Sequence, residues 1–138
     1  MKDEKEIDLR LRTKRFALKI ITLYSSLPKS TEAQVIGKQV LRSGTSVGAN
    51  YREAYRARSD SEFISTLGVC LKELEETSYW LELLDESKIV LLKDLEFLSD
   101  ECNQLTAIFT SIVKSKKKDF WFFIIYPSRF NNLCFIFS

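Results

Sequence analysis

Apolar side chains recur every three or four residues through most of the chain, a spacing that places them on one face of an α-helix. The first stripe runs from about Asp3 to Ser26, ends before Pro28, and consists of Leu9, Phe16, Ile20, Leu23 and Leu27. The most regular stripe comes last. It is an a/d heptad seam formed by Leu91, Leu95, Leu98, Cys102, Leu105, Phe109 and Ile112. We expect both segments to be amphipathic helices.

Two further stripes lie between these. The second helix begins near Thr31, where Gln34 fits a capping box, and its stripe is Val35, Ile36, Val40, Val47 and Ala54. The third begins at Ser59, where Glu62 fits another capping box, and its stripe is Phe63, Leu67, Cys70, Leu74, Leu81 and Leu84. Four helices with short links predict an all-α fold, an antiparallel up-down-up-down four-helix bundle. The alternative is a three-helix bundle with a loose fourth segment.

Small residues crowd the middle of the second helix. Gly44 and Gly48 are four residues apart and therefore share a helix face. Each costs about 1 kcal/mol relative to alanine inside a helix, so their presence needs a reason. Close approach of another helix inside the bundle is the first interpretation. Approach of a neighbouring subunit or a ligand, or a break in the helix near Gly44, are the alternatives.

The end of the chain has a different composition. Residues 119–138 hold six of the ten phenylalanines. Because the four stripes are complete by Ile112, we expect a bundle over residues 1–118 and a non-core C-terminal extension over residues 119–138. An extension without selected function, a membrane-surface anchor that follows the basic Lys-Ser-Lys-Lys-Lys run, and a segment packed on an oligomer surface are the three hypotheses for it.

Charge is distributed unevenly along the chain, although the net charge is only +2. Residues 1–58 carry 13 basic and 6 acidic side chains, and residues 59–113 carry 3 and 12. Residues 114–138 carry 5 basic side chains and 1 acidic side chain. Such polarity predicts one basic and one acidic region on the surface.

The residues of common catalytic centres are scarce. Histidine is absent, which removes the commonest general base and metal ligand. Cys70, Cys102 and Cys134 are too far apart for a metal motif, and the first two occupy stripe positions typical of a core. We therefore expect no enzyme, no metal and no cofactor. The unpaired cysteines and the lack of a long apolar run predict a cytoplasmic protein without a membrane span.

Basic residues follow the small-residue stretch. Arg52 and Arg56 lie four residues apart on one face, Arg42 is expected to point roughly the same way, and Arg58 follows. Tyr51 and Tyr55 run beside them, and cations interleaved with aromatic rings are typical of nucleic-acid surfaces. The first helix adds Arg10, Arg12, Lys14, Arg15 and Lys19. The alternatives are a solvated face paired with the acidic third helix, and an arginine-rich subunit interface.

The same stretch carries a family resemblance. Its motif consists of Arg42, Ser46-Val47, Asn50, Glu53, Arg58-Ser59 and Glu62-Phe63. From about Arg15 to Lys116 the chain resembles the four-helix bundle proteins encoded in intervening sequences of bacterial 23S ribosomal RNA genes. Many relatives carry a glycine where this chain has Ala54, which favours a continuous second helix here.

The resemblance implies a homopentamer as well as the bundle. A related group, the accessory proteins of diversity-generating retroelements, binds nucleic acid and a reverse transcriptase, so both are implied partners. Our leading hypothesis is a non-enzymatic, oligomeric bundle that binds structured RNA or DNA through Arg42, Arg52, Arg56, Arg58, Lys14, Arg15 and Lys19. The alternative is a protein-interaction scaffold that uses its arginines between subunits.

Overall fold

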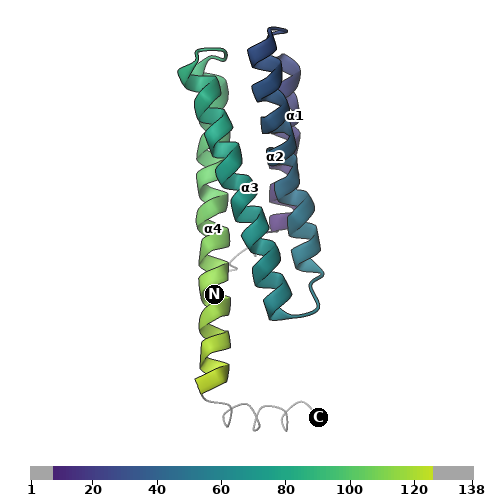
Figure 1. Cartoon of the computed structure of the whole chain (residues 1–138), viewed down its shortest axis with the longest axis vertical. Helices are drawn as coiled ribbons and strands as arrows, with labels where there is room; N and C mark the ends of the chain where they lie inside the picture. The colour runs from purple at the N-terminus through teal and green to yellow at the C-terminus, as the bar shows by residue number, and fades with distance from the viewer. Residues whose placement is uncertain (1–7, 126–138) are drawn as a thin grey trace, which may run out of the picture.

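The computed structural model describes residues 8–125, which form four α-helices. They are α1 (Leu9–Ser26), α2 (Thr31–Tyr55), α3 (Asp60–Glu86) and α4 (Leu92–Ile125). The helices alternate in direction (Figure 1), each packs on the next, and α4 makes a smaller contact with α1. The predicted antiparallel four-helix bundle is confirmed. Within residues 8–125, α1 and α3 lie diagonally across the bundle and do not pack on each other.

The predicted stripes form the core, with two exceptions. One interior cluster includes Phe16 and Ile20 of α1 and Val47 of α2. It also contains residues from the apolar stripe of α3 and from that of α4. The prediction that Val35 lies in the core is wrong, because its side chain is 58% exposed. The first turns of α2 bury Ala33 and Gly37 instead. The prediction that Leu91 lies in the core is also wrong, because this residue lies in the turn before α4 and is 78% exposed.

The glycines of α2 bring it close to α1. A Cβ at Gly44 would lie 2.8 Å from Cγ1 of Ile20, and one at Gly48 would lie 3.2 Å from Oγ1 of Thr13. Gly37, which the pattern did not single out, meets Leu27 in the same way. Close approach inside the bundle is therefore confirmed. The alternative of a break near Gly44 is wrong, since α2 runs unbroken to Tyr55.

Helix starts follow the predicted caps only in part. Ser59 caps α3 as expected, with its Oγ accepting from the Glu62 backbone N–H at 3.1 Å. The capping box at Thr31 is wrong, because Ser30 occupies the cap position and the Gln34 amide donates to the Pro28 carbonyl at 2.8 Å. α1 begins at Leu9, after the N-cap Asp8, and residues 1–7 lie outside the described part of the chain.

The backbone does not change at the boundary expected between residues 118 and 119. α4 continues as one helix to Ile125, and its last turns extend beyond the other three helices (Figure 1). Lys116 is tied to the start of α3 through an ion pair with Asp60 at 3.5 Å. The division into a bundle and an extension stays a prediction, and residues 126–138 lie outside the described range.

Candidate nucleic-acid interface

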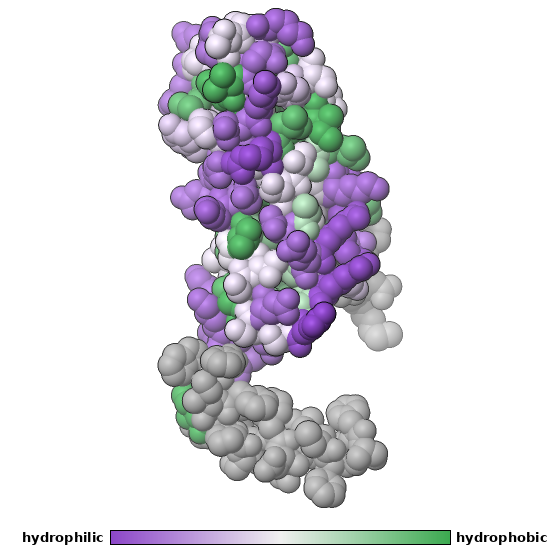
Figure 2. Space-filling view, turned by 45° about the vertical axis from the view of Figure 1, so that its right-hand side comes forward, coloured by the Kyte–Doolittle hydropathy of each residue, from purple (hydrophilic) through white to green (hydrophobic). Residues whose placement is uncertain are grey.

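The two helices with the largest net charge, α1 and α3, lie diagonally opposite each other in the bundle. α1 carries five basic and no acidic side chains, and α3 carries eight acidic and one basic. Because α1 and α3 are diagonal, their outward faces point away from each other. Strongly hydrophilic side chains gather toward the lower right of the described surface in Figure 2. The polarity predicted from the sequence is therefore a polarity across the molecule.

A depression of about 620 Å³, here called the end pocket, lies where α1 begins and α2 ends. Its lining comes from Asp8, Arg10, Leu11 and Lys14 on one side, and from Arg52, Glu53, Tyr55 and Arg56 on the other. The structure thus brings together three of the predicted binding cations, Lys14, Arg52 and Arg56. It adds Arg10, which only its place on the charged first helix had suggested.

Arg10 is held in position at the edge of this pocket. Its guanidinium carbon lies 4.2 Å from the centroid of the Tyr55 ring, a cation–π contact. Its Nε lies 3.7 Å from Asp8 Oδ1, and the same oxygen accepts hydrogen bonds from the backbone N–H groups of Arg10 and Leu11. The Asp8 side chain therefore both caps α1 and restrains Arg10.

The two tyrosines differ in their availability. Tyr55 is exposed, as a stacking residue needs to be. Tyr51 is half-buried and stacks on Phe109 of α4, with ring centroids 5.5 Å apart, and this burial raises the pKa of Tyr51. Tyr51 is therefore mainly a packing residue between helices, and Arg10 lies near enough to lower its pKa against the effect of burial.

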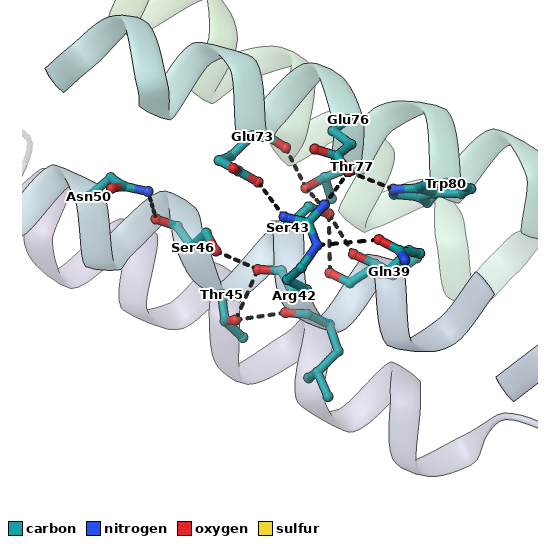
Figure 3. Close-up of polar contacts among 12 residues, drawn as sticks. Gln39, Arg42, Ser43, Thr45, Ser46, Asn50, Glu73, Glu76, Thr77 and Trp80 are labelled. Carbon is teal, nitrogen blue, oxygen red and sulfur yellow. Dashed lines mark hydrogen bonds and ion pairs between the residues drawn. The ribbon is translucent and has the colours of Figure 1, made fainter. Parts of the chain in front are cut away.

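Arg42 does not share the face of Arg52 and Arg56, so that expectation is wrong. Its guanidinium pairs with Glu73 at 3.3 Å and with Glu76, both on α3, as Figure 3 shows. For Arg42 the alternative of a face paired with the acidic third helix is the correct one. Because Arg42 is half-exposed to solvent, such pairs contribute about 0–1 kcal/mol each.

The polar motif residues of α2 mostly satisfy the helix itself. Ser46 Oγ donates to the Arg42 carbonyl at 2.6 Å, and Asn50 Nδ2 donates to the Ser46 carbonyl at 2.9 Å (Figure 3). Sequence reasoning missed a buried hydroxyl pair, Ser43 and Thr77, whose oxygens lie 2.8 Å apart between α2 and α3. The only sign of this pair in the sequence was that both hydroxyl-bearing residues stand at positions of an apolar stripe.

The remaining motif residues lie near the α2–α3 turn. Glu53 lines the end pocket, Glu62 accepts a hydrogen bond from the Arg58 backbone N–H at 2.9 Å, and Phe63 packs against the core. Arg58 lines a separate shallow depression with Lys116, so it lies beside the end pocket rather than in it. These residues shape the turn that follows the end pocket.

Arg15 and Lys19 line a different depression, the groove between α1 and α4, which measures about 560 Å³. Lys19 Nζ lies 3.4 Å from the centroid of the Phe97 ring. Nearby, Arg12 Nε donates to Glu101 at 2.6 Å, and this hydrogen bond raises the pKa of Arg12. The predicted cations thus divide between the end pocket, this groove, the α2–α3 face and the turn.

The cysteines are core residues, as expected. Cys70 and Cys102 are buried free thiols, and burial raises the pKa of each to about 12. Thiols so protonated are poor nucleophiles. Cys134 lies outside the described residues. Over residues 8–125 no three His, Cys, Asp or Glu side chains come together as a metal site, and no helix there is long and apolar enough to cross a membrane.

Fold and surface define a class first: a four-helix bundle in which the most basic helix, α1, lies diagonally opposite the acidic helix α3. The chain belongs to the 23S rRNA-intervening sequence protein family, whose model matches residues 5–111. The predicted resemblance is thereby confirmed.

A solved structure supports the same assignment. The chain is similar to a crystal structure of a protein with unknown function from the S23 ribosomal protein family of Bacteroides thetaiotaomicron VPI-5482. The two share 39% sequence identity and a TM-score of 0.72, over 76% of this chain and 97% of the other. No curated protein matches the chain.

Proposed function

We propose that this protein is a non-enzymatic bundle that binds the phosphates of structured RNA or DNA. The surface responsible, here called the basic face, consists of Arg10, Lys14, Arg15, Lys19, Arg52 and Arg56. The observation that carries the proposal is the convergence of Lys14, Arg52 and Arg56 on one depression. Among the side chains that the structure describes in residues 8–125, no carboxylate forms an ion pair with any of these three cations, which supports a role for their charge in holding a ligand.

Phosphates suit this surface better than the carboxylates of a partner protein would. The cations extend from the end pocket along α1 to Lys19, so they are spread over several turns rather than set as isolated pairs. A regularly charged polyanion can meet them together, and each contact releases a condensed counterion. Such contacts give affinity without sequence choice.

A salt titration tests the proposal. Binding of a mixed RNA or DNA pool should weaken linearly in a log–log plot, with a slope between about −2 and −5 for three to six phosphate contacts. Fluorescence anisotropy with labelled strands measures it. Absence of binding at about 50 mM salt would exclude the proposal, because electrostatic binding is strong at that concentration.

Self-association is a second candidate, supported by apolar side chains on the outside of the bundle. Leu11, Leu18 and Ile21 of α1 and Phe97 of α4 are each between 43% and 53% exposed. They lie beside the cations of α1, and the acidic face of α3 is on the opposite side. A contact between α1 of one copy and α3 of the next would be heterologous, the type that closes into rings. The homopentamer implied by the family resemblance is such a ring.

Light scattering measures the assembly directly. A homopentamer has about five times the 16.1 kDa mass of the chain. Leu18→Glu should lower the measured mass, because the new carboxylate on α1 would be repelled by the acidic α3 of the next copy. The matched control is Val35→Glu, which changes a similarly exposed apolar residue on α2. A parent protein of 16.1 kDa would contradict the candidate.

Two further assignments are proposals of the same kind. The first is a reverse transcriptase partner, which is proposed from the resemblance to retroelement accessory proteins. Its docking surface would be either the basic or the acidic side of the bundle. A cytoplasmic location is supported by the free thiols of Cys70 and Cys102, which suit a reducing compartment.

A further inference from the structure

We propose that the end pocket binds the terminal phosphate monoester of a nucleic-acid strand. This inference rests on the proposed function and specifies which part of the strand this pocket takes. The rest of the basic face would contact internal phosphates of the same strand. The juxtaposition behind it is a concave, cation-lined site at the place where α1 begins and α2 ends.

The charge of the pocket favours a monoester over a diester. Lys14 approaches from α1, and Arg52 and Arg56 approach from α2, so three cations surround one space. A terminal phosphate monoester carries nearly two negative charges at pH 7 and three terminal oxygens, whereas an internal diester carries one charge and two such oxygens. The monoester can therefore satisfy more of these donors at once.

The carboxylates of the pocket argue against a continuous strand. Asp8 and Glu53 line the same space, and a strand crossing it would bring successive phosphates close to them. A strand end reduces this repulsion, because only one phosphate enters the pocket, where it lies among the cations, and the neutral sugar hydroxyls can donate to the carboxylates. The volume of about 620 Å³ lies within the range that small ligands occupy.

Arg10 and Tyr55 provide a flat surface for the terminal base. The Arg10 guanidinium lies over the Tyr55 ring, with its carbon 4.2 Å from the ring centroid. Arginine planes and tyrosine rings are the surfaces on which unpaired bases stack. The backbone N–H groups of Arg10 and Leu11 at the start of α1 are already bonded to Asp8, so the inference assigns the ligand to side chains and not to the helix end.

Matched oligonucleotides test the inference. Short single strands of one sequence, with a 5′-phosphate, a 3′-phosphate or only hydroxyl ends, are compared by anisotropy at constant salt. At least one phosphorylated strand should bind at least about tenfold tighter than the hydroxyl strand. Lys14→Gln with Arg56→Gln should remove that ratio. Arg15→Gln with Lys19→Gln, on the basic face but outside the pocket, should weaken all strands and leave the ratio unchanged.

Each other outcome contradicts the inference in a distinguishable way. Equal binding of phosphorylated and hydroxyl strands overturns end binding and leaves nucleic-acid binding intact. Loss of the ratio in the Arg15→Gln, Lys19→Gln variant also overturns it, because the discrimination would then lie outside the pocket. A nucleoside 5′-monophosphate that binds as tightly as the strand assigns the pocket to free nucleotides instead. Absence of binding by every strand overturns the proposed function as well.

Discussion

Gly48 is the glycine of α2 whose missing Cβ would meet the backbone of α1. A Cβ there would be 3.2 Å from Thr13 Oγ1 and 3.4 Å from the Thr13 carbonyl carbon, so little space is left for a side chain. The spacing of Gly44 and Gly48 was enough to predict a close approach. It could not identify the partner helix, because two glycines mark a face without saying what covers it.

Gly48→Leu should therefore destabilise the fold. The added carbons would have to displace α1, and overpacking of this kind costs about 1–3 kcal/mol of unfolding free energy. Gly68→Leu is the matched control, because nothing lies within 4 Å of a Cβ at Gly68. That variant should gain up to about 1 kcal/mol from helix propensity. Urea denaturation measures both, and equal stabilities would contradict the packing described for Gly48.

Arg42 shows where residue-scale reasoning from sequence failed. Ten residues separate it from Arg52, and at 100° per residue the two side chains leave α2 about 80° apart. Because of that offset, Arg42 contacts Glu73 and Glu76 on α3, whereas Arg52 lines the end pocket beside α1. Full helix-angle arithmetic would have separated them. The acidic partners on α3 could not be paired with Arg42 before the packing of the helices was known.

Among the elements, helix type and order were predictable because each stripe is long and regular. The failures lie at helix starts. Leu91 continues the heptad spacing of α4, but it precedes the first helical residue and follows Lys88, whose φ is +58°. At the start of α2 the buried positions belong to Ala33 and Gly37. Small residues there were overlooked because Val35 gave a stronger hydrophobic signal.

The end of α4 gives a prediction at this scale. A chain that stops after Lys118 should keep the unfolding free energy of the full chain within about 1 kcal/mol. The reason is that, among the side chains that the structure describes, the last contacts of α4 with another helix come from Lys116, which forms an ion pair with Asp60 and lies 5.9 Å from the Phe63 ring centroid. Thermal and urea denaturation measure the difference.

A shorter chain is the control for this truncation. Ending the chain after Ser111 also removes Ile112 and Val113, which pack against the core. Burying an aliphatic side chain of that size contributes about 1.5–3 kcal/mol, so this second truncation should be clearly less stable. A comparable loss in the chain that ends at Lys118 would show that residues 119–138 belong to the folded core.

For the whole molecule, the sequence predicted charge polarity but not its geometry. Counting charges along the chain placed basic residues early and acidic residues in the middle. Their separation onto opposite faces depends on α1 and α3 being diagonal, which follows from the order in which the helices pack. The end pocket was not predictable at all, because it joins residues 8–14 to residues 52–56 through that packing.

The most direct test of the account repeats the salt titration on two charge-matched variants. Arg52→Gln with Arg56→Gln removes two cations from the end pocket, and Lys38→Gln with Lys72→Gln removes two exposed cations outside it. The first variant should bind nucleic acid more weakly, with a log–log slope reduced by up to about two phosphate contacts. The second should match the parent protein. Identical curves for the parent and both variants would contradict the claim that this basic face holds nucleic acid.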